Sequence, residues 1–157
     1  MNNDKTNKQI IGLGLIAGMR TTFAPAIAAH FFSKEQSEDL AESKLAFMQS
    51  PTAAVITKLL AAAEIIGDKL PQTPDRIITT SAAARVAAGA FAGTIVATAR
   101  KENVTRAALL GGVTALASTF ATFYLRRYIS RNTVVKEPIT GAFEDAVAVG
   151  TGFLTMR

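Results

Sequence analysis

Charged residues lie inside four of the five long hydrophobic stretches of this 157-residue chain, and this constrains its fold more than any other feature. The five stretches cover residues 10–32, 52–70, 77–99, 107–125 and 139–156. Only the fourth carries no charged side chain. A charge in the middle of a bilayer costs about 2.5–3.5 kcal/mol on insertion scales, so a chain that accepts several is expected to bring them together.

The charges inside the stretches are arginines on some and carboxylates on others, which predicts a paired polar centre at mid-membrane depth. The candidate binding residues are Arg20, Glu64, Asp68, Arg85, Glu144 and Asp145, with Lys69 and Arg76 as secondary candidates. Glu64 and Asp68 are four residues apart and share one helix face, where two carboxylates can hold a cation, accept arginine partners or relay a proton. The alternative is that such pairs only fix the register of the helices.

The lengths of the stretches predict an all-α, compact polytopic membrane bundle of about five helices, because a span needs about 20 apolar residues. Residues 1–9 are predicted to be a disordered polar tail, and residues 10–157 a single transmembrane domain with a polar or amphipathic connection at 33–50. Pro25 is expected to kink or break the first helix, whereas Pro51 and Pro138 suit helix starts. The alternative fold is a soluble alanine-rich helical bundle.

Small residues recur at four-residue spacing on several stretches and predict close helix packing and self-association. The pairs are Gly14 with Gly18, Gly89 with Gly93, Gly111 with Ala115, and Ala146 with Gly150.

A short internal match suggests an inverted repeat, in which the first two helices correspond to the fourth and fifth. Thr22-Phe23-Ala24 matches Thr119-Phe120-Ala121, with Gly14 aligned to Gly111. An odd displacement of three spans would invert the second copy, as in many transporters whose sites lie between the copies. Coincidence is the alternative explanation of so short a match.

The net charge of +5 comes from basic residues that flank the apolar stretches, as expected beside anionic headgroups and not for a nucleic-acid-binding face. Counting them favours a cytoplasmic N-terminus. The chain has no cysteine, which excludes disulfides and thiolate chemistry, and it carries no hydrolase, phosphate-loop or dinucleotide motif. No cofactor is expected.

Several strings resemble a bacterial family of small integral-membrane proteins known only as a domain of unknown function. The resemblance rests on Gly18-Met19-Arg20, on Glu64-x-x-x-Asp68-Lys69-x-Pro71-x-x-Pro74-x-Arg76, on Arg85 with Gly89, and on Glu144-Asp145. It implies a multi-pass helical protein of the bacterial inner membrane and supplies no activity.

The leading functional hypothesis is a small transporter or channel for an ion or charged solute, which makes an enzyme the less favoured class. The first alternative is a membrane-embedded enzyme on a lipid or isoprenoid phosphate, with Mg²⁺ held by Glu64, Asp68 and Asp145. The second alternative is a non-catalytic scaffold whose buried ion pairs are structural.

Overall fold

The computed structural model describes residues 3–67, 79–132 and 137–156, without the side chains of residues 3, 130 and 132–145. This part of the chain is entirely helical, which confirms the all-α class, but it holds seven α-helices and one 3-10 helix where we predict five helices. The elements are α1 (Asn3–Met19), α2 (Phe23–Lys34), α3 (Glu38–Ala41), η1 (Ala46–Gln49), α4 (Pro51–Gly67), α5 (Thr79–Ala99), α6 (Val104–Asn132) and α7 (Glu137–Met156).

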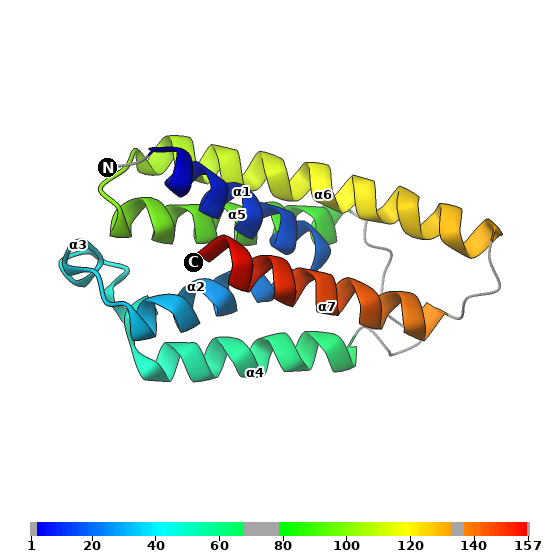
Figure 1. The fold of residues 1–157 in the computed structure, drawn as a ribbon, viewed down its shortest axis with the longest axis horizontal. Coiled ribbons are helices and arrows are strands. Elements are labelled where there is room, and N and C mark those ends of the chain that lie inside the picture. The colour runs from blue at the N-terminus through cyan, green and yellow to red at the C-terminus, as the bar shows by residue number, and fades with distance from the viewer. Residues whose placement is uncertain (1–2, 68–78, 133–136, 157) are drawn as a thin grey trace.

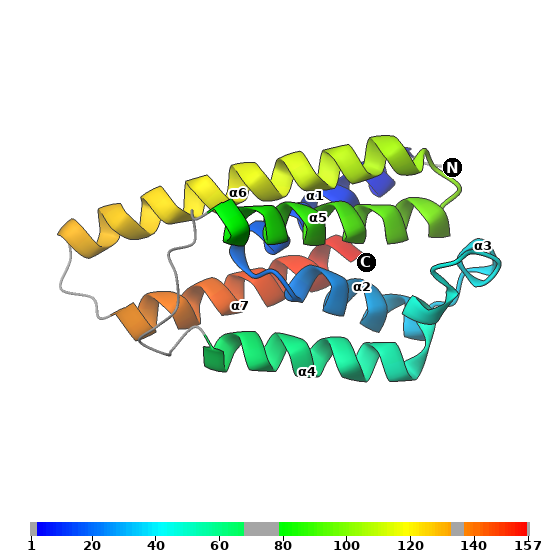
Figure 2. The same cartoon turned by 180° about the vertical axis from the view of Figure 1, so that it is seen from behind.

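The long helices run along one axis in two groups (Figures 1 and 2). Helices α1, α5 and α6 pack closely together, and α2, α4 and α7 lie along one side of them. The start of α1, the helix α3 and the turn between α5 and α6 lie at one end of the bundle, called here the N-terminal end. Helix α6 extends furthest toward the opposite end.

Helices α1 and α2 form a hairpin whose tip lies near the middle of the long axis (Figures 1 and 2). Ile16 and Ile27, on opposite sides of the tip, both contact the same point on α7, where a Cβ added at Gly152 would meet them. The first predicted helix is therefore wrong as a single span, because the chain turns back at Arg20–Thr22. Pro25 does not cause the break: it lies in the first turn of α2, where its missing N–H is not needed.

The predicted disordered tail at 1–9 is also wrong, because α1 begins at Asn3. Thr6, Gln9, Ile10 and Leu13 are buried and share one helical face. Gln9 Nε2 donates a hydrogen bond to the carbonyl oxygen of Met156 at 3.2 Å. Two polar side chains thus continue the buried face of α1, which the hydropathy pattern alone does not indicate.

The predicted inverted repeat is not found, because α1 and α6 run in the same direction (Figure 1). A Cβ at Gly14 would lie against Gly111, and one at Gly18 against Ser118, so contacts advance together along both helices. The aligned glycines, Gly14 and Gly111, lie against each other at this interface, where small residues allow close approach. The match of Thr22-Phe23-Ala24 with Thr119-Phe120-Ala121 has no such explanation, since Phe23 is buried and Phe120 is exposed.

Small residues let the backbones of α1, α5 and α6 approach closely, as predicted. A Cβ added at Gly89 would lie 2.6 Å from the carbonyl oxygen of Gly111, and one at Gly93 would lie 2.5 Å from that of Ala107. Ala146 is exposed and Gly150 faces open space, so this pair does not bring two helices together within the described part of the chain. Self-association through small-residue faces stays a prediction.

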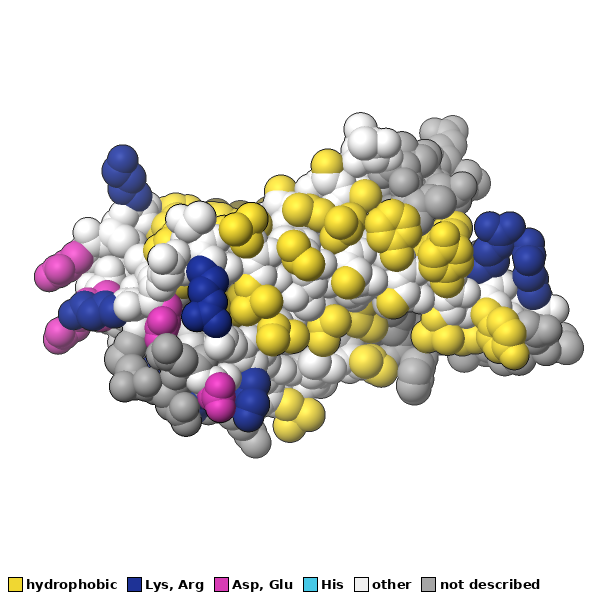
Figure 3. All heavy atoms as spheres, turned by 90° about the horizontal axis from the view of Figure 1, so that it is seen from above, with side chains coloured by type: hydrophobic (Ala, Val, Ile, Leu, Met, Phe, Trp, Pro, Cys, Tyr) yellow, Lys and Arg dark blue, Asp and Glu magenta, His cyan; other side chains and the backbone are white. Residues whose placement is uncertain are grey.

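Large apolar side chains point outward along α6 in a stripe, called here the α6 stripe. Its members are more than a third exposed: Leu109, Val113, Leu116, Phe120, Tyr124, Leu125 and Tyr128. From Leu109 to Tyr128 the stripe is about 28 Å long at 1.5 Å per residue, close to the roughly 30 Å of a bilayer core. Figure 3 shows apolar side chains along the middle of this face and charged ones at both ends.

Two of the described helices are long and apolar enough to cross a membrane, Thr79–Ala99 and Val104–Ile129. The five spans that we predict are therefore not confirmed, in part because the hairpin divides the first into helices of 17 and 12 residues.

The 33–50 connection folds onto the N-terminal end of the bundle. Leu40 and Met48 are buried, as expected for an amphipathic segment, whereas Phe47 is exposed. Ser37 Oγ donates to the carbonyl oxygen of Ala99 at 2.8 Å, and Lys101 Nζ lies 2.8 Å from Asp39 Oδ1. The hydrogen bond from Lys101 to Asp39 raises the pKa of Lys101. The connection is thus attached to the turn between α5 and α6.

Adding one methyl group tests the glycine packing. Gly89→Ala is expected to lower the free energy of unfolding by about 1–3 kcal/mol, because the new Cβ meets backbone that has no room to move. Gly150→Ala is the matched control and should be neutral or stabilising by up to about 1 kcal/mol, since its Cβ enters open space. Thermal unfolding of both purified variants makes the comparison. Equal stability would contradict a tight interface at Gly89.

Candidate functional site

The tip of the α1–α2 hairpin places two helix ends inside the bundle. The last carbonyl groups of α1 and the first amides of α2 have no partner within their own helices and need one elsewhere. The turn between them is only three residues long, Arg20 to Thr22. Side chains from three other helices bind at this turn.

Glu64 of α4 caps the start of α2. Its carboxylate accepts hydrogen bonds from the backbone N–H of Thr21 and of Thr22, each at 2.8 Å. The hydroxyl of Thr22 donates a third. A carboxylate at a helix N-terminus is favoured both by these charge-assisted bonds and by the helix dipole.

Arg85 of α5 caps the end of α1. Its Nη1 donates to the carbonyl oxygen of Gly18 at 2.6 Å and to that of Met19 at 3.0 Å. Arg85 is almost fully buried and lies on the same face of α5 as Gly89 and Gly93. The glycines bring α5 close to its neighbours, and the guanidinium one turn away then reaches the end of α1.

Hydroxyl groups of α6 bind the same end of α1. Ser118 Oγ donates to the carbonyl oxygen of Leu15 at 2.7 Å. The Thr119 hydroxyl donates to the carbonyl oxygen of Ala115 in its own helix at 2.8 Å and shares this proton with the Gly18 carbonyl oxygen, which lies 3.3 Å away. Three helices therefore hold the tip in place.

Arg20 lies in the turn itself and is 3% exposed. It joins Arg85 and Glu64 at the tip, so the three described ionisable groups there carry two positive charges and one negative charge, a formal sum of +1. We call Arg20, Glu64 and Arg85 the tip cluster.

The sequence predicts all three members of the tip cluster, and the structure places them at one turn. Asp68, Lys69 and Arg76 lie outside the described residues. Glu144 and Asp145 belong to α7, and their side chains also lie outside the described part. Whether these five complete the charged centre stays a prediction.

Sequence reasoning missed the backbone groups that the cluster binds. A signal for them exists: Thr21 and Thr22 immediately precede a phenylalanine and Pro25, and threonine followed by an early proline is typical of a helix start. The long apolar run from residue 10 to 32 hides this signal, because the polar turn between its two halves is only three residues long.

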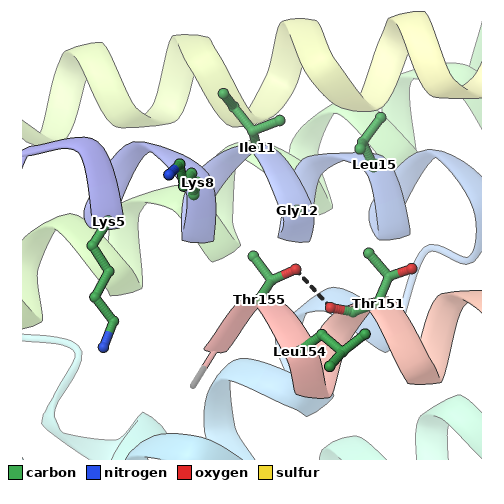
Figure 4. Close-up of a pocket in the computed structure, with 8 residues that line it drawn as sticks. All are labelled: Lys5, Lys8, Ile11, Gly12, Leu15, Thr151, Leu154 and Thr155. Atoms are coloured by element: carbon green, nitrogen blue, oxygen red, sulfur yellow. Dashed lines mark hydrogen bonds between the residues drawn. The ribbon is translucent and has the colours of Figure 1, made fainter.

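Two grooves flank the C-terminal half of α7, and neither is lined by the tip cluster. The first, about 480 Å³, lies between α1 and α7, with Ile11, Leu15 and Leu154 along it and Lys5 and Lys8 toward the start of α1 (Figure 4). The second, about 330 Å³, lies between α2, α4 and α7.

No group of three or more histidine or acidic side chains converges within the described residues. Glu64 is the described member of the predicted Mg²⁺ set, and it is engaged at the hairpin tip. Asp68 and Asp145 have no described side chains, so the Mg²⁺ site of the enzyme alternative stays a prediction.

Comparison with known proteins gives one match. Residues 9–157 match the family model described as Domain of unknown function (DUF4126). No curated protein and no solved structure matches the chain.

Removing the Glu64 carboxylate should destabilise the fold. Glu64→Ala leaves the amides of Thr21 and Thr22 without their acceptor, at a cost of about 2–5 kcal/mol in the free energy of unfolding. Glu64→Gln, which keeps one acceptor oxygen, should fall between this variant and wild type. Glu42→Ala, at an exposed position, is the control. If Glu64→Ala and Glu42→Ala lower the free energy of unfolding by the same amount, the Glu64 cap does not stabilise the fold.

Arg85 is expected to tolerate no neutral replacement. Arg85→Met removes the donor to two buried carbonyls and should lower the free energy of unfolding by about 2–4 kcal/mol. Arg85→Lys should recover part of this, because an ammonium group can reach one carbonyl but lacks the planar fork. Arg106→Met, at an exposed position, serves as the control in the same unfolding assay. Equal stability of Arg85→Met and Arg106→Met would show that α1 ends without help from α5.

Proposed function

This chain belongs to the DUF4126 family, and we propose that it is a small integral-membrane protein that passes an ion or small charged solute through its tip cluster. The observation that carries the proposal is the pair of helix ends held near the middle of the bundle by the buried Arg85 and the partly buried Glu64. In secondary transporters, broken helices of this kind form the substrate and ion sites near the bilayer midplane.

The distribution of side-chain sizes supports a membrane location. Buried positions in α5 are mostly alanine and glycine, whereas the α6 stripe places leucine, phenylalanine and tyrosine outward. Helices in lipid pack through small residues in this way, and monomers in water rarely expose so long an apolar surface. Tyr124 and Tyr128 lie next to Arg126, Arg127 and Arg131, an order typical of the headgroup region.

We propose the bacterial inner membrane as the location, with the N-terminal end of the bundle in the cytoplasm. Among the described residues, this end carries seven basic side chains: Lys5, Lys8, Lys34, Lys44, Arg100, Lys101 and Arg106. The opposite end carries three, which are Arg126, Arg127 and Arg131. Basic residues concentrate on the cytoplasmic side of bacterial membrane proteins.

The described part of the tip cluster is best suited to a small anion. Two arginines and the N-terminal amides of α2 are all positive partners, and helix N-termini bind anions readily. In this structure Glu64 occupies the anion's position on Thr21 and Thr22. When movement of α4 takes Glu64 off the two amides, these donors become available to a solute anion.

The scaffold alternative is favoured by a different observation. The tip cluster and the helix ends already satisfy one another, and neither described groove is lined by Arg20, Glu64 or Arg85. In this alternative the charges only fix the hairpin against α4 and α5.

Flux measurements separate the two functions. Proteoliposomes of wild type, Glu64→Gln and Arg20→Met would be assayed with a panel of small anions, cations and imposed proton gradients, with Lys44→Met as the surface control. We expect wild-type flux of one anion class, at least about tenfold slower in both cluster variants and unchanged in Lys44→Met. Any variant that does not fold in detergent is excluded by size-exclusion chromatography. If folded wild-type protein passes none of these solutes above empty liposomes, the scaffold alternative holds.

A further inference from the structure

The groove between α2, α4 and α7 is apolar along its length and open to the surroundings of the protein. Its walls are formed by Phe23 and Ile27 of α2, Ala62 and Ile65 of α4, and Val149 and Phe153 of α7. Its volume of about 330 Å³ lies within the usual range of ligand sites.

Positive charge is confined to one end of this groove. Lys58 Nζ lies 2.9 Å from His30 Nδ1, so α2 and α4 bring two polar groups to a single point. An ammonium group can only donate hydrogen bonds, so Nδ1 accepts this one and two further N–H groups of Lys58 remain to bind an acceptor. Lys34 follows one turn further along α2 and adds a second charge at the same end.

The polar end of the groove faces the N-terminal end of the bundle, and the apolar end lies beside the hairpin tip. Phe23 follows Thr22 of the tip, and Ile65 follows Glu64, whereas His30 lies seven residues further along α2. The groove is therefore about 10 Å long, less than the roughly 15 Å depth of one hydrocarbon leaflet. A ligand with a charged headgroup near the membrane surface and an apolar chain directed toward the hairpin tip would match this arrangement of polar and apolar ends.

We infer that the groove binds one anionic phospholipid of the leaflet at the N-terminal end, with its phosphate on Lys58 and His30 and one acyl chain between α2, α4 and α7. Charge complementarity selects the headgroup, because Lys58 and Lys34 place positive charge at this end. Exposed Lys58 and Ala62 show that the groove opens outward, as a site filled from the bilayer must.

The bound lipid would bridge the hairpin and the helix that caps it. Its acyl chain would touch Phe23 next to Thr22 and Ile65 next to Glu64, so its binding energy favours the arrangement in which α4 lies against α2. The inference rests on the proposed membrane location and not on solute passage, so a failed flux assay would leave it standing.

Lipid retention by native mass spectrometry tests the site on the full chain in detergent, with dioleoyl phosphatidylglycerol and dioleoyl phosphatidylcholine as probes. We expect wild type to retain one phosphatidylglycerol and to bind phosphatidylcholine at least about fivefold more weakly, the change that one basic residue contributes near an anionic surface. Lys58→Met should remove this preference, whereas Lys44→Met, which changes an exposed lysine away from the groove, should keep it.

A second pair of variants tests the position of the acyl chain. Ala62→Phe fills the groove and should reduce retention of both lipids, while Ala63→Phe, at an exposed position outside the lining, should not. Equal retention of the two lipids by wild type, or equal effects of Lys58→Met and Lys44→Met, would overturn the headgroup assignment. Equal effects of Ala62→Phe and Ala63→Phe would overturn the acyl position. Inorganic phosphate that binds at Lys58 and excludes the lipid would instead make the site one for a free anion.

Discussion

The need to satisfy two helix ends inside an apolar bundle governs this structure. A hairpin tip away from water leaves carbonyl groups at the end of α1 and amides at the start of α2 that each require a partner. Arg85 serves the first and Glu64 the second, and each comes from a different helix. The charges therefore define where α4 and α5 pack, and the rest of the bundle is arranged around them.

Close packing makes this arrangement possible. The guanidinium of Arg85 reaches Gly18 and Met19 because Gly89 and Gly93 let α5 approach its neighbours. On α6, Ser118 and Thr119 combine small size with a hydroxyl that donates to α1. The same positions thus provide both contact and hydrogen bonding, which in lipid are the main sources of attraction between helices.

The sequence predicts the class of fold, the approximate limits of α5 and α7 and the three described members of the tip cluster, because charge in an apolar run and glycine spacing are local signals. It does not predict the hairpin, since only three polar residues, Arg20 to Thr22, interrupt the apolar run and the groups that stabilise the turn come from α4, α5 and α6. The apparent repeat misleads for a related reason. Gly14 and Gly111 match because they face each other across one interface, and sequence similarity cannot distinguish this from duplication.

The sequence separation of the tip's partners sets an order on assembly in the cell. Glu64 follows the amides that it caps by 42 and 43 residues, and Arg85 follows the Gly18 carbonyl by 67. During synthesis the hairpin is therefore made before either of the side chains that cap it. Its two helix ends acquire all the partners described above only after α4, α5 and α6 have been synthesised.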